Sequence, residues 1–393
     1  MAIDSQLTPT PRLLLGPGPS DAHPRVLTAM TTPLLGHLDP QFLQIMNETQ
    51  ELLRLVYQTK NRLTFPVSAT GMAGMEACVV NLIEPGDKMV VCENGYFGTR
   101  MLDVAGRAGA VVTHLPRPWG QVFDLQEIRE TLHRARPKVL GIVHAETSTG
   151  ALQPLDELGA LCREFDALLV VDAVTSLGCI PVPVDEWGID AVYSCSQKGL
   201  GCPPGLSPVS FSDRAVAALK ARKSKVQSWY LDLSMIESYW GGDRAYHHTA
   251  PITMIYALRE GLRIVAEEGL ENRFARHWRN HRALKAGLAA LDMGYVAAEG
   301  QRLPQLNAVR IPAGVDDVAG RKLLLNDHGI EVGGGLGEFK GKVWRIGLMG
   351  YNSQPRSVML VLAALEQVLH KLGAAVTPGS SIAAASAVYA AEG

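Results

Sequence analysis

Short apolar segments alternate with amphipathic segments between residue 88 and residue 194, and this rhythm restricts the fold more than any other feature. The apolar segments cover residues 88–92, 109–113, 139–144, 167–172 and 190–194. Several are apolar throughout, as expected of strands whose two faces are both buried. Helix-like patterns separate them at residues 99–108, 125–134 and 154–165. The alternation predicts an α/β domain in which helices flank a mostly parallel sheet.

The pattern changes near residue 255, where long amphipathic helices begin to dominate. Helices are predicted at residues 255–267, 273–291 and 354–372, and strands at residues 307–311 and 342–346. We therefore expect an N-terminal arm at residues 1–20, a large domain at 21–265 and a small α+β domain at 266–372. Residues 373–393 have small side chains and no clear period, which predicts a disordered tail.

Composition restricts the possible partners and compartment. The chain carries 37 Lys and Arg against 39 Asp and Glu, so nothing predicts binding to nucleic acid or to an anionic membrane. No apolar stretch is long enough to span a bilayer, and the N-terminal sequence does not resemble a signal peptide. The six cysteines form no C-x-x-C pair and lie at positions 78, 92, 162, 179, 195 and 202. We expect reduced core cysteines and a cytoplasmic protein.

Polar residues follow several of the predicted strands. Asp172, Lys198 and Thr147 each lie at or beyond the end of such a segment, and Phe97 follows another. Ligands of open α/β sheets bind beyond the carboxyl ends of the strands, so these side chains should share one site. Upstream, residues 68–76 read SATGMAGME and resemble a turn that opens a helix, whose free N–H groups suit a phosphate. A lysine, an acid, a phosphate cup and an aromatic ring are what pyridoxal 5′-phosphate requires.

The chain resembles the class V aminotransferases of fold type I, in the alanine–glyoxylate and serine–pyruvate group. The resemblance covers residues 13 to 350 and rests on LLLGPGPS, SATGMAGMEA, NGYFGTR, HAETSTG, VDAVTSLG, YSCSQKGLGCPPG, YHHTAP and VWRIGLMG. Each stretch alone is weakly specific, but their joint occurrence in this order is highly specific. The resemblance implies a large domain with a mostly parallel seven-stranded sheet and a smaller C-terminal α+β domain.

The resemblance also implies roles for individual residues around the cofactor. Lys198 would bind pyridoxal 5′-phosphate through a Schiff base and then carry the proton during the reaction, and Asp172 would pair with the pyridine nitrogen. Phe97, where relatives often have tryptophan, would stack on the ring, and Thr147 would hydrogen-bond near the ring hydroxyl. The phosphate would be held by Thr70, Gly71, Met72 and Gln197.

Further roles implied by the resemblance concern the partner subunit and the substrate. Tyr246 and Thr249 would reach the phosphate of a neighbouring subunit, which makes a homodimer with shared active sites the functional unit. Arg345 would bind the substrate carboxylate through its fork of donors, with Gly18 also in the substrate site. The expected reaction moves an amino group from alanine or serine to glyoxylate in two stages. The expected partners are therefore small amino acids and 2-oxo acids.

Other functions stay open at this point. Serine–glyoxylate, aminoethylphosphonate–pyruvate and hydroxykynurenine transamination would need only a different side-chain pocket. A cysteine desulfurase usually has histidine where this chain has Gln197, and it needs a mobile nucleophilic cysteine. A catalytically silent subunit would have lost Lys198 or Asp172, and both are present.

Two other kinds of site are not favoured by the sequence. His277 and His281 lie four residues apart, but the glutamate of a zincin motif and a third ligand are missing, so we expect no metal site. Residues 68–76 do not match the G-x-G-x-x-G pattern, so a dinucleotide is not expected there.

Overall fold

A seven-stranded sheet forms the centre of the larger domain. In the computed structural model, which describes residues 7–392, the strand order is β2-β10-β9-β8-β5-β3-β4. Only β10 runs antiparallel to its neighbours, so the predicted α/β fold with a mostly parallel sheet is confirmed. The strands are β2 (Leu63–Val67), β3 (Lys88–Glu93), β4 (Val111–Pro116), β5 (Val139–Val143), β8 (Leu168–Asp172), β9 (Ala191–Tyr193) and β10 (Ser207–Phe211).

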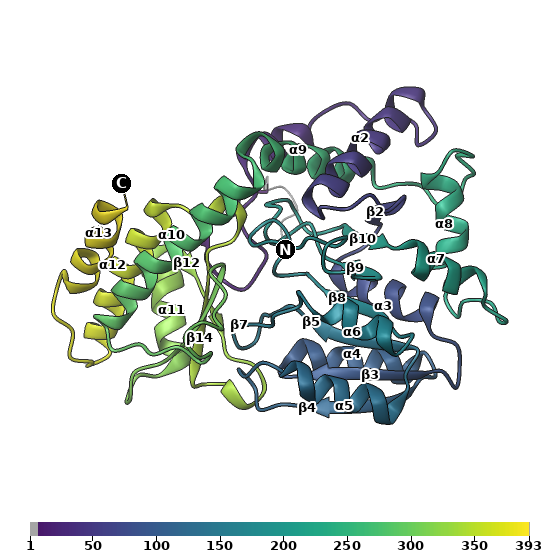
Figure 1. The fold of residues 1–393 in the computed structure, drawn as a ribbon. Helices are drawn as coiled ribbons and strands as arrows, with labels where there is room; N and C mark the ends of the chain where they lie inside the picture. The colour runs from purple at the N-terminus through teal and green to yellow at the C-terminus, as the bar shows by residue number, and fades with distance from the viewer. Residues whose placement is uncertain (1–6, 393) are drawn as a thin grey trace, which may run out of the picture.

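Helices cover both faces of this sheet (Figure 1). The chain moves outward from β3 to the edge strand β4 through α4, and returns past β3 to β5 through α5. Because crossovers between parallel strands are right-handed, this reversal places α4 and α5 on opposite faces. The central strands are buried on both sides, which explains their apolar sequences. The helices of this domain are α1 (Pro24–Ala29), α2 (Pro40–Val56), α3 (Gly71–Leu82), α4 (Tyr96–Arg107), α5 (Leu125–Ala135), α6 (Leu158–Glu164), α7 (Asp213–Lys220), α8 (Leu233–Trp240) and α9 (Ile252–Glu268).

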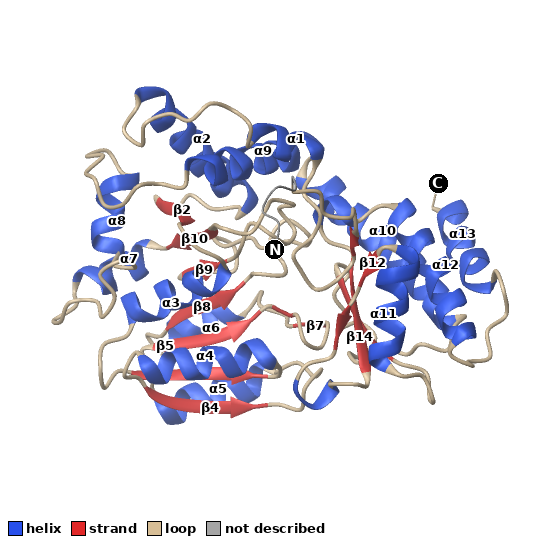
Figure 2. Cartoon of the chain, turned by 180° about the vertical axis from the view of Figure 1, so that it is seen from behind, coloured by secondary structure: helices blue, strands red, loops and turns tan. Residues whose placement is uncertain are grey.

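The carboxyl ends of the parallel strands point toward the second, smaller domain (Figure 2). That domain contains a three-stranded antiparallel sheet in the order β11-β14-β13. Its elements are α10 (Leu270–Ala289), β11 (Leu306–Arg310), α11 (Asp317–His328), β12 (Ile330–Glu331), β13 (Gly333–Gly334), β14 (Val343–Gly347), α12 (Pro355–Lys371) and α13 (Ser380–Ala391). Short 3₁₀ helices lie at Gly337–Phe339 and Gly350–Asn352. The junction between α9 and α10 is Gly269, in a conformation with φ of 79° that favours glycine.

The N-terminal segment joins the two domains. Its strand β1 (Leu13–Leu14) pairs in parallel with β12 of the small domain, and Leu15 is part of the small domain's hydrophobic core. A two-stranded ribbon, β6 (Ala145–Glu146) with β7 (Ala151–Leu152), follows β5 at the same edge of the large sheet. Among the described residues, no helix combines the length and the apolar character needed to cross a membrane.

The tail is the clearest difference from the sequence-based expectation. Residues 373–393 were expected to be disordered, but α13 occupies most of this segment and packs on α10 and α12. Glu366 accepts hydrogen bonds from the N–H groups of Gly379 and Ser381, both at 2.8 Å, and so holds the start of the helix. Ala385 is fully buried, and the Tyr389 hydroxyl donates to Asn280 at 2.7 Å. The expectation was wrong because small side chains permit close helix packing without an obvious amphipathic pattern.

Candidate active site

Lys198 lies in the loop that follows β9 and is only 8% exposed. Its Nζ donates a hydrogen bond to the carbonyl oxygen of Pro17 in the N-terminal segment. Gly18 lies against the lysine side chain, where a Cβ atom would come within 2.5 Å of Lys198 Cε. Burial lowers the pKa of the Lys198 amine, because the charged form loses its hydration. The loop therefore holds a buried amine that is easier to deprotonate than a surface lysine.

Asp172 ends the neighbouring strand β8 and is also buried. Its carboxylate accepts hydrogen bonds from the Val174 N–H and from the Tyr193 hydroxyl, each at 2.8 Å. Burial is the dominant influence and raises the pKa of Asp172 to about 6, although both hydrogen bonds and the charge of Lys198 act in the opposite direction. A buried carboxylate of this kind favours a cationic or N–H partner.

The amino end of α3 faces the same space. Thr70 is the N-cap residue, and its side chain makes no capping hydrogen bond, so the hydroxyl and the first N–H groups of the helix are available. Gly71, the first residue of α3, packs closely against Cys195, since a Cβ atom at position 71 would lie 3.1 Å from Cys195 Cβ. The Oε1 atom of Gln197 is buried without a hydrogen-bond partner among the described residues. These groups can bind a polar ligand such as a phosphate.

Eight of the twelve residues expected in the site line one cavity of about 240 Å³. They come from the N-terminal segment, from α3, from α4 and from the ends of β8 and β9, namely Gly18, Thr70, Gly71, Met72, Phe97, Asp172, Gln197 and Lys198. Arg100 lines the same cavity, and its guanidinium lies 5.3 Å from the centre of the Phe97 ring. The ends of several strands therefore bring distant sequence segments together, as expected for an open α/β sheet.

Arg345 and Thr147 are buried and in contact with each other, but they do not line this cavity. Arg345 lies on β14 and is 7% exposed; its Nε donates to Gly334 O at 2.8 Å, and its Nη1 lies 3.4 Å from Thr147 O. Burial lowers the pKa of Arg345 to about 10, and its positive charge also contributes to the lowered pKa of Lys198. The Thr147 hydroxyl is paired with the Thr175 hydroxyl at 2.6 Å.

Glu146 is the carboxylate whose charge acts on Arg345, but its oxygens have other hydrogen-bond partners. They accept hydrogen bonds from the Ser148 hydroxyl at 2.6 Å and from the Phe97 N–H at 3.2 Å. Burial raises the pKa of Glu146 to about 7. Among residues 7–392, no ion pair neutralises the buried Arg345 guanidinium.

Tyr246 and Thr249 are not part of the cavity within one chain. Both are exposed, and Tyr246 is 61% exposed with its ring 5.1 Å from that of His37. The structure therefore does not bring these two residues to the Lys198 site of their own chain.

His277 and His281 have structural partners. His277 Nε2 accepts a hydrogen bond from the Gly350 N–H at 3.1 Å, so Nδ1 carries the proton and donates to Arg273 O at 2.7 Å. His281 Nδ1 lies 2.7 Å from Asn307 Oδ1. Within the described part of the chain, no group of three or more His, Cys, Asp or Glu side chains could hold a metal ion.

The sequence reasoning missed three groups that shape the site. Tyr193 donates to Asp172, Arg100 borders the cavity, and the Pro17 carbonyl accepts from Lys198. Tyr193 could have been found, because it ends the strand next to the one that carries Asp172. The other two depend on how α4 and the N-terminal segment pack, which periodicity does not reveal.

The donor set fits pyridoxal 5′-phosphate. A buried amine and a buried carboxylate border one cavity, together with an uncapped helix start and an aromatic ring. The unpartnered Gln197 Oε1 and the Asp172 carboxylate, which has no ion-pair partner among residues 7–392, would gain partners from such a group. When bound, this cofactor acts as a sink for the electrons released at the substrate carbon.

Comparison with known proteins gives a consistent result. The family model described as class-V aminotransferase matches residues 14–354. The (S)-ureidoglycine–glyoxylate transaminase of Bacillus subtilis is 42% identical, covering 96% of this chain and 95% of that protein. The alanine–glyoxylate aminotransferase of Mus musculus is also 42% identical, covering 94% and 90%. The crystal structure of alanine–glyoxylate aminotransferase from Nostoc sp. is 55% identical with a TM-score of 0.92, covering 93% of this chain and 97% of that one. The chain therefore belongs to the class-V aminotransferases, fold-type I enzymes that depend on pyridoxal 5′-phosphate.

Proposed function

We propose that this enzyme transfers the amino group of L-alanine or L-serine to glyoxylate. Glycine would be formed together with pyruvate or hydroxypyruvate. The Bacillus, Mus and Nostoc relatives are all named for glyoxylate, which supports glyoxylate as the acceptor here. The donor and the acceptor would use the same site in turn, each held by its carboxylate.

The observation that carries this proposal is the buried and unpaired guanidinium of Arg345. A buried cation is costly unless an anion neutralises it, and no carboxylate of residues 7–392 forms an ion pair with Arg345. Its charge acts on Lys198, so an anion bound there would lie near the reactive amine. A small amino acid and a small 2-oxo acid each supply one carboxylate for this fork of donors.

In this proposal Lys198 holds the cofactor and then moves the proton at the substrate carbon. Its lowered pKa suits a base that must lose and regain a proton near neutral pH. Asp172 would face the pyridine nitrogen, and its hydrogen bonds from Val174 and Tyr193 would fix its orientation. Thr70, Gly71 and Gln197 would hold the phosphate.

A second candidate donor is ureidoglycine. The Bacillus relative is named for ureidoglycine and glyoxylate, and its identity to this chain equals that of the Mus alanine–glyoxylate enzyme. Both donors carry a carboxylate next to the amino group, so Arg345 would serve either one. The difference must arise from the residues around the donor's side chain.

Desulfurase activity is not supported. The six cysteines are buried, and burial raises the pKa of each thiol, most strongly for Cys78 and Cys92. A nucleophilic cysteine should instead be exposed and easily ionised.

We also propose that the enzyme works as a homodimer. Large aromatic side chains are exposed beside the start of α3. Trp229 is 62% exposed. Tyr230 is 39% exposed, and its hydroxyl donates a hydrogen bond to Ser68 O, just before α3. Trp229 stacks on His247, which directly follows the exposed Tyr246. Exposed aromatic side chains of this kind suit a protein partner, and a second copy would bring Tyr246 and Thr249 toward the phosphate site.

The test is the first half-reaction with a panel of amino donors, in the absence of any 2-oxo acid. L-alanine, L-serine and (S)-ureidoglycine would each be mixed with the holoenzyme alone, and the absorbance of the bound cofactor would report the first half-reaction. We expect alanine or serine to react at least about tenfold faster than the other donors, a difference of about 1.4 kcal/mol. Faster reaction with ureidoglycine would support the second candidate, and a holoenzyme that reacts with none of them would refute the proposal.

A further inference from the structure

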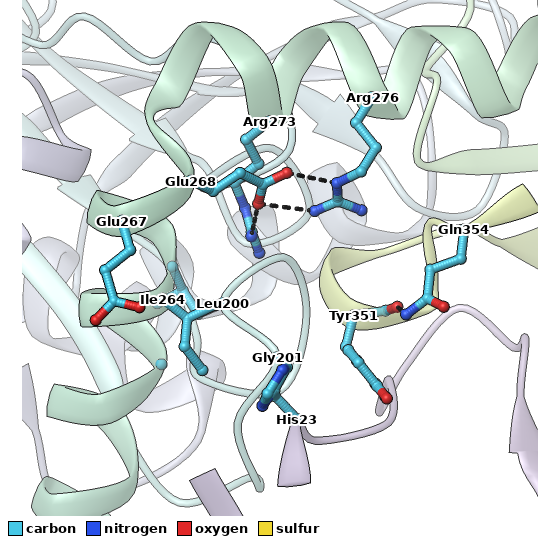
Figure 3. A pocket seen from close by; sticks show the side chains of 11 residues that line it. His23, Leu200, Gly201, Ile264, Glu267, Glu268, Arg273, Arg276, Tyr351 and Gln354 are labelled. Carbon is cyan, nitrogen blue, oxygen red and sulfur yellow. Dashed lines mark hydrogen bonds and ion pairs between the residues drawn. The ribbon is translucent and has the colours of Figure 1, made fainter. Parts of the chain in front are cut away.

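A second cavity, of about 430 Å³, borders the lysine loop just beyond Lys198 (Figure 3). It is lined by Leu200 and Gly201 of this loop, by residues around the α9–α10 junction, and by Tyr351 and Gln354 of the small domain. Figure 3 shows Glu268 between Arg273 and Arg276, with both guanidinium groups directed at its carboxylate.

Arg273 connects α10 to the lysine loop. It is 3% exposed, and its Nη2 donates to Gly199 O at 2.6 Å, the carbonyl of the residue that follows Lys198. Its Nε donates to Gly178 O at 2.7 Å, and its Nη1 pairs with Glu268 at 2.7 Å. A single buried side chain therefore fixes two backbone carbonyls of the large domain.

Arg276, one turn further along α10, connects to the small domain. Its Nη1 donates to Gly350 O at 3.0 Å and to Ser353 O at 2.5 Å, and its Nε pairs with Glu268 at 2.5 Å. The same segment begins three residues after the end of β14, the strand that carries Arg345. His277 adds a contact by accepting from the Gly350 N–H.

The arginines of this cavity are not free to bind an anion. Glu268 pairs with both guanidinium groups, and their remaining donors are directed at backbone carbonyls. The charged groups therefore connect segments of the protein to one another.

We propose that Arg273, Arg276 and Glu268 form a positioning unit that sets the Lys198 loop relative to the segment following Arg345. Arg273 holds the loop, Arg276 holds the small-domain segment, and Glu268 joins them. Displacements of about 1 Å at an active site can reduce rates by about 100-fold, so a unit that fixes both sides of the site should affect catalysis without touching the substrate. This inference rests on the proposed role of Lys198, but not on the identity of the amino donor.

The test compares Arg273→Met with Arg282→Met in the holoenzyme. Arg282 lies on the same helix, is exposed, and pairs with Glu392 far from the lysine loop. Hydrogen exchange of residues 196–202 and 349–353 would be measured with bound pyridoxal 5′-phosphate, together with the pH midpoint of the cofactor absorbance and with kcat. For Arg273→Met we expect faster exchange in both segments, a shifted midpoint and a roughly tenfold lower kcat. Arg282→Met should match the wild type.

If Arg273→Met does not fold, Glu268→Gln provides the same test, since it keeps the side-chain volume and both carbonyl contacts of Arg273 but removes the shared charge. It should shift the exchange and the midpoint in the same direction by a smaller amount. Exchange and midpoint that equal the wild type in either variant would overturn the proposal. A wild-type enzyme that shows no cofactor bound to Lys198 would instead refute the proposed function, so the two failures can be distinguished.

Discussion

Two buried arginines act on the Lys198 loop, and their surroundings differ in one respect. Arg345 and Arg273 are 7% and 3% exposed. Arg273 has a carboxylate partner, Glu268, and directs its other donors at backbone carbonyls. Arg345 has no ion-pair partner among the described residues and only one short hydrogen bond, to Gly334 O. Both side chains are buried, and the ion-pair partner is what differs between them. This difference supports the proposed role of Arg345 in binding a substrate carboxylate.

The two cavities differ in the same way as the two arginines. In the larger one, beside Arg273, Glu268 pairs with both arginines. The smaller one, beside Lys198, contains polar groups that have no hydrogen-bond or ion-pair partner among the described residues. Gln197 Oε1 has no hydrogen-bond partner among residues 7–392, and the Thr70 hydroxyl makes no capping hydrogen bond. The Asp172 carboxylate accepts two hydrogen bonds but has no ion-pair partner among those residues. Volume alone therefore does not identify the proposed site.

The largest expected effect comes from Lys198→Ala, which removes the buried amine of the site. We expect kcat/KM to fall by at least about 10³-fold, because covalent attachment and proton transfer are both lost. The folded structure should remain, since the side chain makes a single hydrogen bond, to Pro17 O. Steady-state kinetics with a thermal melt check both points, and Lys220→Ala on the exposed face of α7 is the control.

Asp172→Asn tests whether a buried acid without an ion-pair partner also lowers the stability of the cofactor-free protein. Burial raises the pKa of Asp172 from 3.8 to about 6, so the folded state binds this proton more tightly than the unfolded state does. The resulting stabilisation of the folded state is fully present below pH 3.8 and is lost as the pH rises through 6. At pH 7 the buried charge should cost about 3 kcal/mol in cofactor-free protein. Denaturant unfolding should therefore show a more stable variant at pH 7 and no difference near pH 4.

The matched control for that experiment is Asp190→Asn. Asp190 is equally buried, but it is paired with Arg214 at 2.9 Å. Its substitution should lower the free energy of unfolding because the paired cation is left behind. If Asp172→Asn is also destabilising at pH 7, Asp172 is not an uncompensated charge.

Arg345→Met should separate the two arginines directly. We expect KM for the amino acid and for the 2-oxo acid to rise by about 10- to 100-fold, since each loses a charge-assisted contact of about 1.5–3 kcal/mol. The cofactor-free protein should lose little stability, whereas Arg273→Met should lose more. An increase in KM for only one of the two substrates would contradict the shared site.

The smallest effect is expected for Tyr246→Phe, which tests whether a second copy completes the site. Loss of one hydroxyl contact to the cofactor phosphate should weaken cofactor binding by about five- to tenfold, or about 1 kcal/mol. Equilibrium titration of the cofactor-free protein would measure it, with Tyr389→Phe on α13 as the control. Unchanged affinity would show that Tyr246 does not reach the phosphate.

The sequence allowed prediction of the large sheet and of the groups at its strand ends. The β5 and β8 segments are apolar throughout because both faces are buried, and Asp172 and Lys198 meet because adjacent strands end at the same edge. Helix α13 was missed because its alanines carry no amphipathic period, and its docking depends on the distant Glu366 and Asn280. The contacts of Arg273 could not be predicted for a related reason, since its partners are backbone carbonyls 74 and 95 residues away in the sequence.

The most direct test of the account is to locate the covalent attachment of the cofactor in the wild-type enzyme. The holoenzyme would be reduced with borohydride, digested and analysed by mass spectrometry, without reference to any substrate. The reduced pyridoxyl group should lie on Lys198 alone. Attachment to any other lysine, or no attachment in fully loaded enzyme, would contradict it.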